Sequence, residues 1–470
     1  MPDPEISPEL LDATIESRAF VVLLAIAAIV GVVVSLATWC FLELINQIQR
    51  GVFVHLPSDL GYHGGAPEWW PLPVLAIAGV VVAFAIDRLP GQAGHIPANG
   101  LAAGGGPAMP IELPGILLAA LATIGLGVVL GPEAPLIALG AGLAMLTLRL
   151  ARKDVPPEVL TVVAAAGSFA AVSFLFESPL IAAVIMIEAT GLGGPKLRLV
   201  LLPGLLAAGV GTLVSVGLGS WTGLSTSAYA LGTLPLPAFP RPDGADFGWT
   251  IALAIAVAAV TTIVIRGGKG TQRVAKPRPF LVLPAVGLIV AGLAIAFQQT
   301  TGKGFMEVLF SGQSALPGLV SHAPAWSLSA LALLIVFKGL AYSLSLGSFR
   351  GGPTFPAIFL GAAAGLMAAQ LPGFSITPAV VVGMGAATVA VLRLPLSAVV
   401  IASVLSAKSG LGAEPLVIVG VVVSYIVTVR LSAPAPAPAA GDTPAIAPGG
   451  PVAAGGQVTR SNTPSENPAR

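Results

Sequence analysis

Long apolar runs recur along the whole chain, and they constrain its fold more than any other feature. Residues 20–37, 74–86, 251–265 and 281–297 contain no charged side chain. Each approaches the roughly 20 residues that an α-helix needs to cross the hydrocarbon layer of a membrane. Only 9% of the 470 residues are charged and 55% are hydrophobic, against about 25% charged in soluble domains. The sequence therefore predicts an all-α integral membrane protein that crosses the bilayer many times.

The basic residues indicate how the chain is oriented in the membrane. Residues 266–278 carry five basic side chains and no acidic one between two apolar runs, so the positive-inside rule places this loop in the cytoplasm. The first residues are acidic, unlike the basic start of a secretory signal, and the first apolar run is expected to be retained. We expect a multi-pass protein of a bacterial plasma (inner) membrane with both termini in the cytoplasm.

Composition divides the chain into five parts. Residues 1–18 form a polar N-terminal segment, and residues 221–247 are rich in Pro, Gly and Ser, as expected of a linker. From residue 432 a Pro/Ala/Gly mixture begins that cannot bury enough apolar surface to fold. We therefore expect two membrane regions at 19–220 and 248–431, joined by the linker and followed by a disordered tail at 432–470.

The two membrane regions resemble each other. GPEAPLIALGAG at 131–142 matches GPTFPAIFLGAA at 352–363, and SPLIAAVI at 178–185 matches LPLSAVVI at 394–401. Two matches in the same order at a nearly constant spacing indicate a duplicated unit of about 200 residues. In transporters, duplication of this kind commonly produces two inverted repeats with broken and re-entrant helices around a central site.

The repeated motif is suited to binding an anion. Each copy begins with Gly-Pro and runs into an apolar segment, so we expect Pro132 and Pro353 in the first turn of helices that start inside the membrane. Such a helix presents unpaired amides and a partial positive charge at its start. Two opposed starts would form an anion site without any Lys or Arg.

Glu133 is the acidic side chain closest to this proposed site. An ionisable residue at membrane depth is a functional candidate, although Glu133 could instead simply cap the helix start. Glu188 could relay protons or lie at an interfacial helix end. We give no role to five other charged residues, namely Glu43, Glu177, Lys338, Arg350 and Arg393.

Several classes of function are disfavoured. A net charge of +1 gives no indication of nucleic-acid binding. Cys40 is the single cysteine, no HExxH motif is present, and we expect neither a metal site nor a cofactor. No nucleophile pairs with a base at helical spacing, so an enzyme is not expected.

Three segments resemble the signatures of the CLC family of chloride channels and chloride/proton exchangers. The family's GSGIP, GxEGP and GGxFxP correspond here to AGHIP at 93–97, GPEAP at 131–135 and GGPTFP at 351–356. The resemblance spans most of residues 19–431 and is that of a divergent bacterial-type member without regulatory CBS domains. It implies transport of chloride, in exchange for protons in many members, by a homodimer with one pathway in each subunit.

The resemblance also implies roles for individual residues. Glu133 corresponds to the gate, which protonation neutralises and releases from the anion path. The anion-binding positions correspond to Gly94, His95, Ile96, Gly131, Pro132, Ala134, Pro353, Thr354 and Phe355.

This sequence departs from the family pattern at several places. Gly94 replaces a serine that contacts the anion, and a tyrosine expected after the last span has no match. The family's paired acids are Glu188 and Ala189 here, which favours a channel over an exchanger. Thr354 occupies the place of a phenylalanine, and Phe355 follows it. A secondary transporter for another anion or small solute is the main alternative, because unrelated folds also use inverted repeats.

Overall fold

The computed structural model describes residues 8–101, 106–151, 154–191, 194–222 and 231–432. The expected disordered tail, apart from residue 432, lies outside this part of the chain, as do residues 1–7 and the central part of the expected linker. The described residues form α-helices and short single-turn helices, and their only β-type pairing is one isolated bridge. The predicted all-α class is confirmed.

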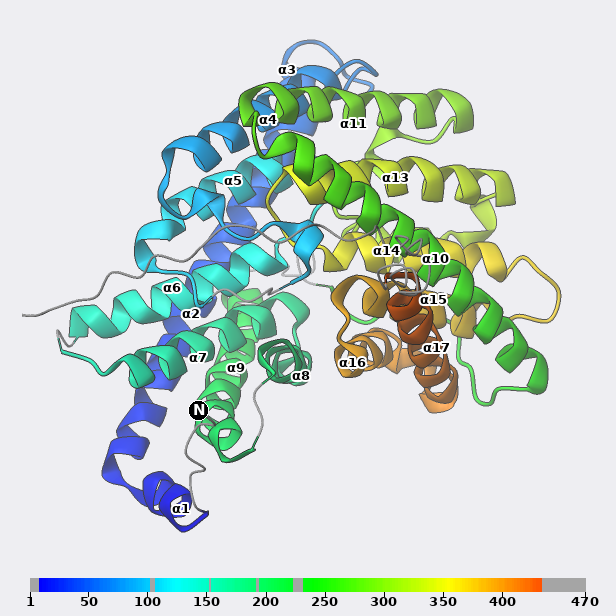
Figure 1. Ribbon diagram of the computed structural model, residues 1–470. Helices are drawn as coiled ribbons and strands as arrows, with labels where there is room; N and C mark the ends of the chain where they lie inside the picture. Colours follow the sequence, from blue (N-terminus) through cyan, green and yellow to red (C-terminus); the bar gives the residue numbers. More distant parts are fainter. Residues whose placement is uncertain (1–7, 102–105, 152–153, 192–193, 223–230, 433–470) are drawn as a thin grey trace, which may run out of the picture. The chain divides into compact units, whose positions relative to one another are not determined.

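Figure 1 shows the helices in chain order. Those of the first half are α1 (Pro8–Glu16), α2 (Arg18–Arg50), α3 (Leu56–Asp59), α4 (Pro71–Arg88), α5 (Leu113–Gly125), α6 (Glu133–Ala151), α7 (Pro157–Phe176), α8 (Pro179–Thr190) and α9 (Gly194–Thr222). Those of the second half are α10 (Gly244–Ala275), α11 (Pro279–Thr301), α12 (Leu316–Ser321), α13 (Leu328–Ser348), α14 (Thr354–Ala368), α15 (Ile376–Leu392), α16 (Pro395–Leu405) and α17 (Glu414–Ser432).

Membrane-length helices dominate the described residues. Nine helical stretches are long and apolar enough to span a bilayer, and the four apolar runs singled out from the sequence lie in α2, α4, α10 and α11. Large apolar side chains on these helices, such as Ile29, Ile77, Ile263 and Ile289, are exposed. Exposed apolar surface of this kind on membrane-length helices is stable against lipid or a partner subunit and not against water. The chain is a multi-pass membrane protein.

Five apolar helices are shorter than a membrane span, among them α8, α14 and α16. α14 and α15 are buried along almost their whole length. Because a short helix leaves its ends at membrane depth, its terminal amides and carbonyls need partners within the protein. These helices are the broken elements that the sequence predicted.

Equivalent glycines pack the same helix pair in both halves. Gly140 of α6 lies against the backbone of Gly167 in α7, and Gly361 of α14 lies against Gly383 in α15. Gly140 and Gly361 occupy the same place in the two copies of the repeated motif. A side chain at any of the four would collide with main-chain atoms of the partner helix, so small residues permit the close crossing.

The expected linker is less independent of the second half than its composition suggests. Residues 231–243 have no regular secondary structure, and the amides of Leu234 and Phe239 donate to the carbonyls of Leu405 and Ser409 at 2.7 and 2.9 Å. α10 begins at Gly244 rather than at 248, because Asp243 caps it by accepting the amide of Asp246 at 2.9 Å. This part of the linker therefore packs against the second half.

Candidate functional site

The starts of α6 and α14 meet at one point. Gly131 and Gly352 form an antiparallel bridge in which the amide of Gly131 donates to Gly352 at 2.8 Å and the amide of Gly352 donates to Gly131 at 2.5 Å. The chain therefore runs in opposite directions as it enters the two helices, as inverted repeats require. The predicted convergence of the two copies of the motif is confirmed.

Glu133 joins the two helix starts through its side chain. Its Oε1 accepts the amide of Phe355 at 2.7 Å, although Glu133 begins α6 and Phe355 lies in the first turn of α14. The residue is only 2% exposed, and Oε2 has no hydrogen-bond partner among the described residues. The carboxylate thus occupies the positive end of a helix from the opposite repeat.

Glycine is required on both sides of this carboxylate. A Cβ atom added at Gly131 or Gly352 would overlap the carboxylate of Glu133. Neither glycine has a positive φ angle, so the requirement is one of space and not of backbone conformation.

The two prolines lie one position earlier than the sequence predicted. α6 begins at Glu133, and the carbonyl of Pro132 accepts the amide of Leu136 at 3.0 Å, while Pro353 is the N-cap of α14. At an N-cap only the carbonyl enters the helix, so the missing N–H of proline again costs nothing. The hydroxyl of Tyr342 donates to the carbonyl of Pro353 at 2.5 Å and fixes the start of α14.

The other predicted anion-binding positions of α6 and α14 surround this point. Ala134 follows Glu133 and is partly buried, whereas Thr354 is fully buried as the first residue of α14. The ring of Phe355 stacks on Phe176 of α7, with 5.2 Å between the centroids. Phe355 therefore offers its amide to the site, while its side chain packs in the core.

The loop between α4 and α5 has an unusual backbone. Residues 91–94 have φ angles of 76°, 49°, 60° and 87°, a left-handed run that is costly for Gln92 and Ala93. His95 follows, with Nε2 2.6 Å from the carbonyl of Gly100, and the carbonyl of Ile96 accepts the amide of Asn99 at 3.0 Å. Strain of this kind persists only where the surrounding structure imposes it.

All three sequence signatures border one cavity of about 560 Å³. Its wall includes Gly94 and His95 from the first signature, Ala134 from the second and Gly351 from the third. The sequence placed these segments in one pathway, and they lie together in the structure.

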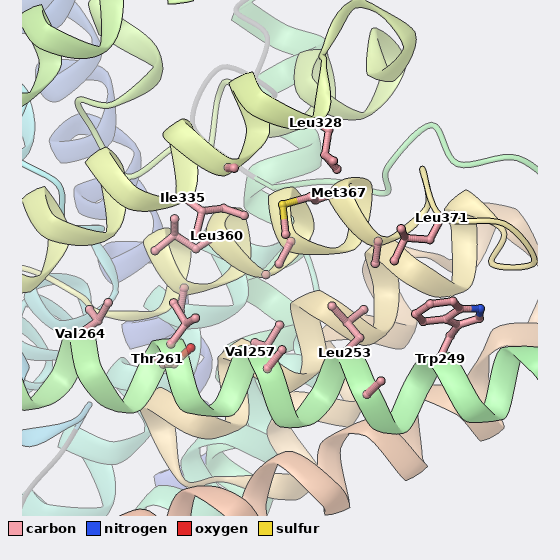
Figure 2. A pocket seen from close by; sticks show the side chains of 18 of the residues that line it. Trp249, Leu253, Val257, Thr261, Val264, Leu328, Ile335, Leu360, Met367 and Leu371 are labelled. Atoms are coloured by element: carbon pink, nitrogen blue, oxygen red, sulfur yellow. The ribbon is translucent and has the colours of Figure 1, made fainter. Parts of the chain in front are cut away.

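A second cavity, of about 520 Å³, lies between α10, α13 and α14 and is almost entirely apolar. Figure 2 shows Leu253 and Val257 of α10 facing Ile335 of α13 and Met367 of α14 across it. No charged side chain lines it among the described residues. Because an anion there would have no compensating donors, the anion path is not expected to pass through this cavity.

The sequence predicts no role for Lys338, yet it is fully buried in α13. Its ammonium donates to the carbonyls of residues 307–310 at 3.0–3.2 Å and lies 4.5 Å from the ring centroid of Phe359. The amide of Phe310 in turn donates to the carbonyl of Gly127 at 3.0 Å. Lys338 thus fixes residues 307–310, which contact Gly127 in the segment that precedes α6. A lysine in the middle of an apolar run was the signal for it.

Glu188 caps a helix from the opposite repeat. It is partly buried and accepts the amides of Leu396 and Ser397 at 2.9 and 2.7 Å, and the hydroxyl of Ser397 at 2.6 Å. In the first repeat, Ser178 performs this function for α8 by accepting the amide of Ile181 at 3.2 Å. The position equivalent to Ser178 is Leu394, which has no side-chain acceptor.

The described residues contain no cluster of three or more His, Cys, Asp or Glu side chains that could hold a metal ion. Glu133 and Glu188 instead accept hydrogen bonds from the start of a helix in the opposite repeat.

Both a family model and a curated relative match this chain over most of its length. The family model described as voltage gated chloride channel matches residues 78–429. The protein YfeO of Escherichia coli (strain 55989), whose name assigns it to ion transport, is 30% identical over 356 residues, covering 75% of this chain and 80% of YfeO.

Solved structures share the fold. A slow cyanobacterial Cl⁻/H⁺ antiporter has a TM-score of 0.70 at 21% identity, with 87% of this chain and 95% of that chain covered. A CLC-type fluoride/proton antiporter has a TM-score of 0.66 at 18% identity, with 90% and 97% covered.

Proposed function

We propose, from the premise that this chain belongs to the voltage-gated chloride channel family, that it moves chloride or a similar small anion through a path that Glu133 gates. The hydrogen bond from the amide of Phe355 to Glu133 carries this proposal. An anion in the same place would accept the same amide, so the ionised carboxylate and the anion compete for one donor.

Protonation provides the means of opening. A neutral carboxyl group gains less from the helix start than a carboxylate does, and it leaves the amide of Phe355 available to an anion. The flux should therefore rise as the pH falls. Gly94, His95, Ile96, Gly131, Pro132, Ala134, Pro353, Thr354 and Phe355 would border the anion along its path.

The path could work as a channel or as a chloride/proton exchanger. Glu188 is the acidic residue that we assign as a possible proton relay, and its three hydrogen bonds to α16 would have to break or weaken for it to accept a proton. Both structural relatives named above are proton-coupled antiporters, which supports the exchanger.

Anion flux from liposomes with imposed gradients tests the proposal. An outward chloride gradient that drives protons against their own gradient would identify an exchanger, whereas chloride movement without proton movement would identify a channel. Absence of chloride, fluoride and nitrate flux from folded protein would contradict the proposal. The same assay with organic acids would reveal a transporter for another solute.

We further propose that the protein is a homodimer in a bacterial plasma membrane, with both termini in the cytoplasm. The basic residues at the end of α10, which include Arg266, Lys269 and Arg273, support this orientation because they are exposed and basic loops favour the cytoplasmic side. Cross-linking in liposomes would test the dimer, and a monomer at all protein-to-lipid ratios would contradict it.

A further inference from the structure

Arg350 lies next to the third signature and lines the cavity of about 560 Å³ that the three signatures border. It is 7% exposed, although an isolated buried charge is costly. His95 and Gly351 line the same cavity. A buried guanidinium facing a cavity needs a partner, and its hydrogen bonds show how much of that need the protein meets.

The protein provides hydrogen-bond acceptors for only some of the N–H donors of the guanidinium. Nε donates to the carbonyl of Gln92 at 3.4 Å, and Nη1 donates to the carbonyl of Phe349 at 3.2 Å. Within the described part of the chain, Nη2 has no hydrogen-bond partner and Arg350 forms no ion pair. Glu112 also lines the cavity, but its Oε2 accepts the amide of Met109 at 2.8 Å.

Lys338 provides a contrast within the same molecule. Its ammonium is enclosed by four carbonyls, so the protein itself satisfies its hydrogen-bond donors. Arg350 has two carbonyl acceptors and an open cavity instead. The difference indicates that the remaining donors of Arg350 are kept for a ligand and not for the fold.

We propose that Arg350 binds a small anion in this cavity, and that its guanidinium, whose Nη2 has no partner among the described residues, favours planar oxyanions such as nitrate over chloride. This inference rests on the proposed function. It adds to the pathway an anion-binding site that carries a full positive charge. The two helix starts at Glu133 supply only partial charges. Arg350 is not among the anion-binding positions that the sequence predicts.

The chemistry of the site supports the preference for oxyanions. A guanidinium presents parallel N–H donors that match two oxygens of one anion, which a spherical halide cannot do as well. The cavity has room for several waters at about 30 Å³ each. An anion held there keeps part of its hydration shell, and this lets it leave the site again.

His95 contributes to the wall of the site more than to its charge. Its Nε2 lies 2.6 Å from the carbonyl of Gly100 and must carry a proton to donate to it. In a neutral imidazole Nδ1 is then an acceptor and has no proton to offer an anion. The carbonyl of Gln92, which Arg350 contacts, belongs to the strained left-handed run. This hydrogen bond holds the Arg350 side chain against the loop between α4 and α5.

Thermal unfolding of the purified full-length protein in detergent tests the site without relying on flux. Increasing sodium nitrate should raise the unfolding temperature of the wild type saturably, because an anion that binds the folded state stabilises it. Sodium chloride should do so at roughly ten-fold higher concentrations, and at equal concentration it serves as the control for ionic strength. R350Q should need at least about ten-fold more nitrate for the same shift. R149Q, which removes an exposed arginine at the end of α6, should behave as the wild type.

Two outcomes would overturn the proposal. An R350Q protein whose nitrate dependence matches the wild type would show that Arg350 is only a clamp between Gln92 and Phe349. If R350Q does not fold, R350K keeps the charge but loses the planar edge, and an unchanged preference for nitrate over chloride in R350K would contradict the proposal. Failure of the proposed transport would appear separately, as absence of flux from wild-type liposomes.

Discussion

Gly131 and Gly352 pair their backbones across the two halves of the chain, with N to O distances of 2.8 and 2.5 Å. This bridge sets the starts of α6 and α14 against each other, and the space beside it would be closed by a Cβ at either glycine. Glu133 fills that space. The geometry of the proposed gate therefore depends on two residues that have no side chain.

G131A should displace the Glu133 carboxylate. The nearest atoms to a Cβ at this position all belong to the Glu133 side chain, so the flexible carboxylate is expected to move and the backbone to stay. Anion flux at neutral pH should rise toward that of E133A and lose most of its dependence on pH. Flux from liposomes over a series of pH values measures this.

The double variant G131A/E133A provides the control. The three atoms nearest to the added methyl group all belong to the Glu133 carboxylate, and E133A removes them. The double variant should therefore match E133A in both flux and stability. A G131A protein with the wild-type pH profile would show that the carboxylate does not occupy this space during transport.

E188A should destabilise the protein by about 1–2 kcal/mol, because the amides of Leu396 and Ser397 lose their cap. Adding L394S should restore part of this loss, since Leu394 occupies the place that Ser178 occupies in the first repeat. Chemical or thermal unfolding in detergent measures both changes. Equal stability of E188A and the wild type would argue against the capping role.

K338M should lower stability by roughly 3 kcal/mol or more, because the carbonyls of residues 307–310 lose their shared donor inside the protein. K303M is the matched control. Lys303 also contacts a carbonyl and an aromatic ring, those of Ala325 and Trp326, but it is partly exposed, so its loss should cost about 0.5 kcal/mol or less. Similar stability of the two variants would contradict the structural role of Lys338.

The sequence alone predicts those features of the fold that come from long apolar runs or from an internal repeat. The membrane helices follow from long apolar runs, and the meeting of residues 131–135 with 351–356 follows from the internal match. These signals are local, or are duplicated along the chain. They require no knowledge of which distant residues come into contact.

Features that depend on a single long-range contact were not predictable. Glu188 caps a helix more than 200 residues away because Leu394 cannot cap it, and the carbonyls around Lys338 belong to a loop outside its own helix. Arg350 carried only one sequence signal, its place directly before the Gly-Gly of the third signature. Its free donors become evident only when the cavity wall is known.

The pH dependence of anion flux in E133A tests the central claim most directly. Liposomes containing wild-type protein should release chloride faster as the pH is lowered from about 8 to about 4, a range that spans the ordinary pKa of a glutamate. E133A should release chloride at a high rate that is independent of pH, and E133Q should behave similarly. A wild-type pH profile that persists unchanged in E133A would contradict the gate, even if the protein transports anions.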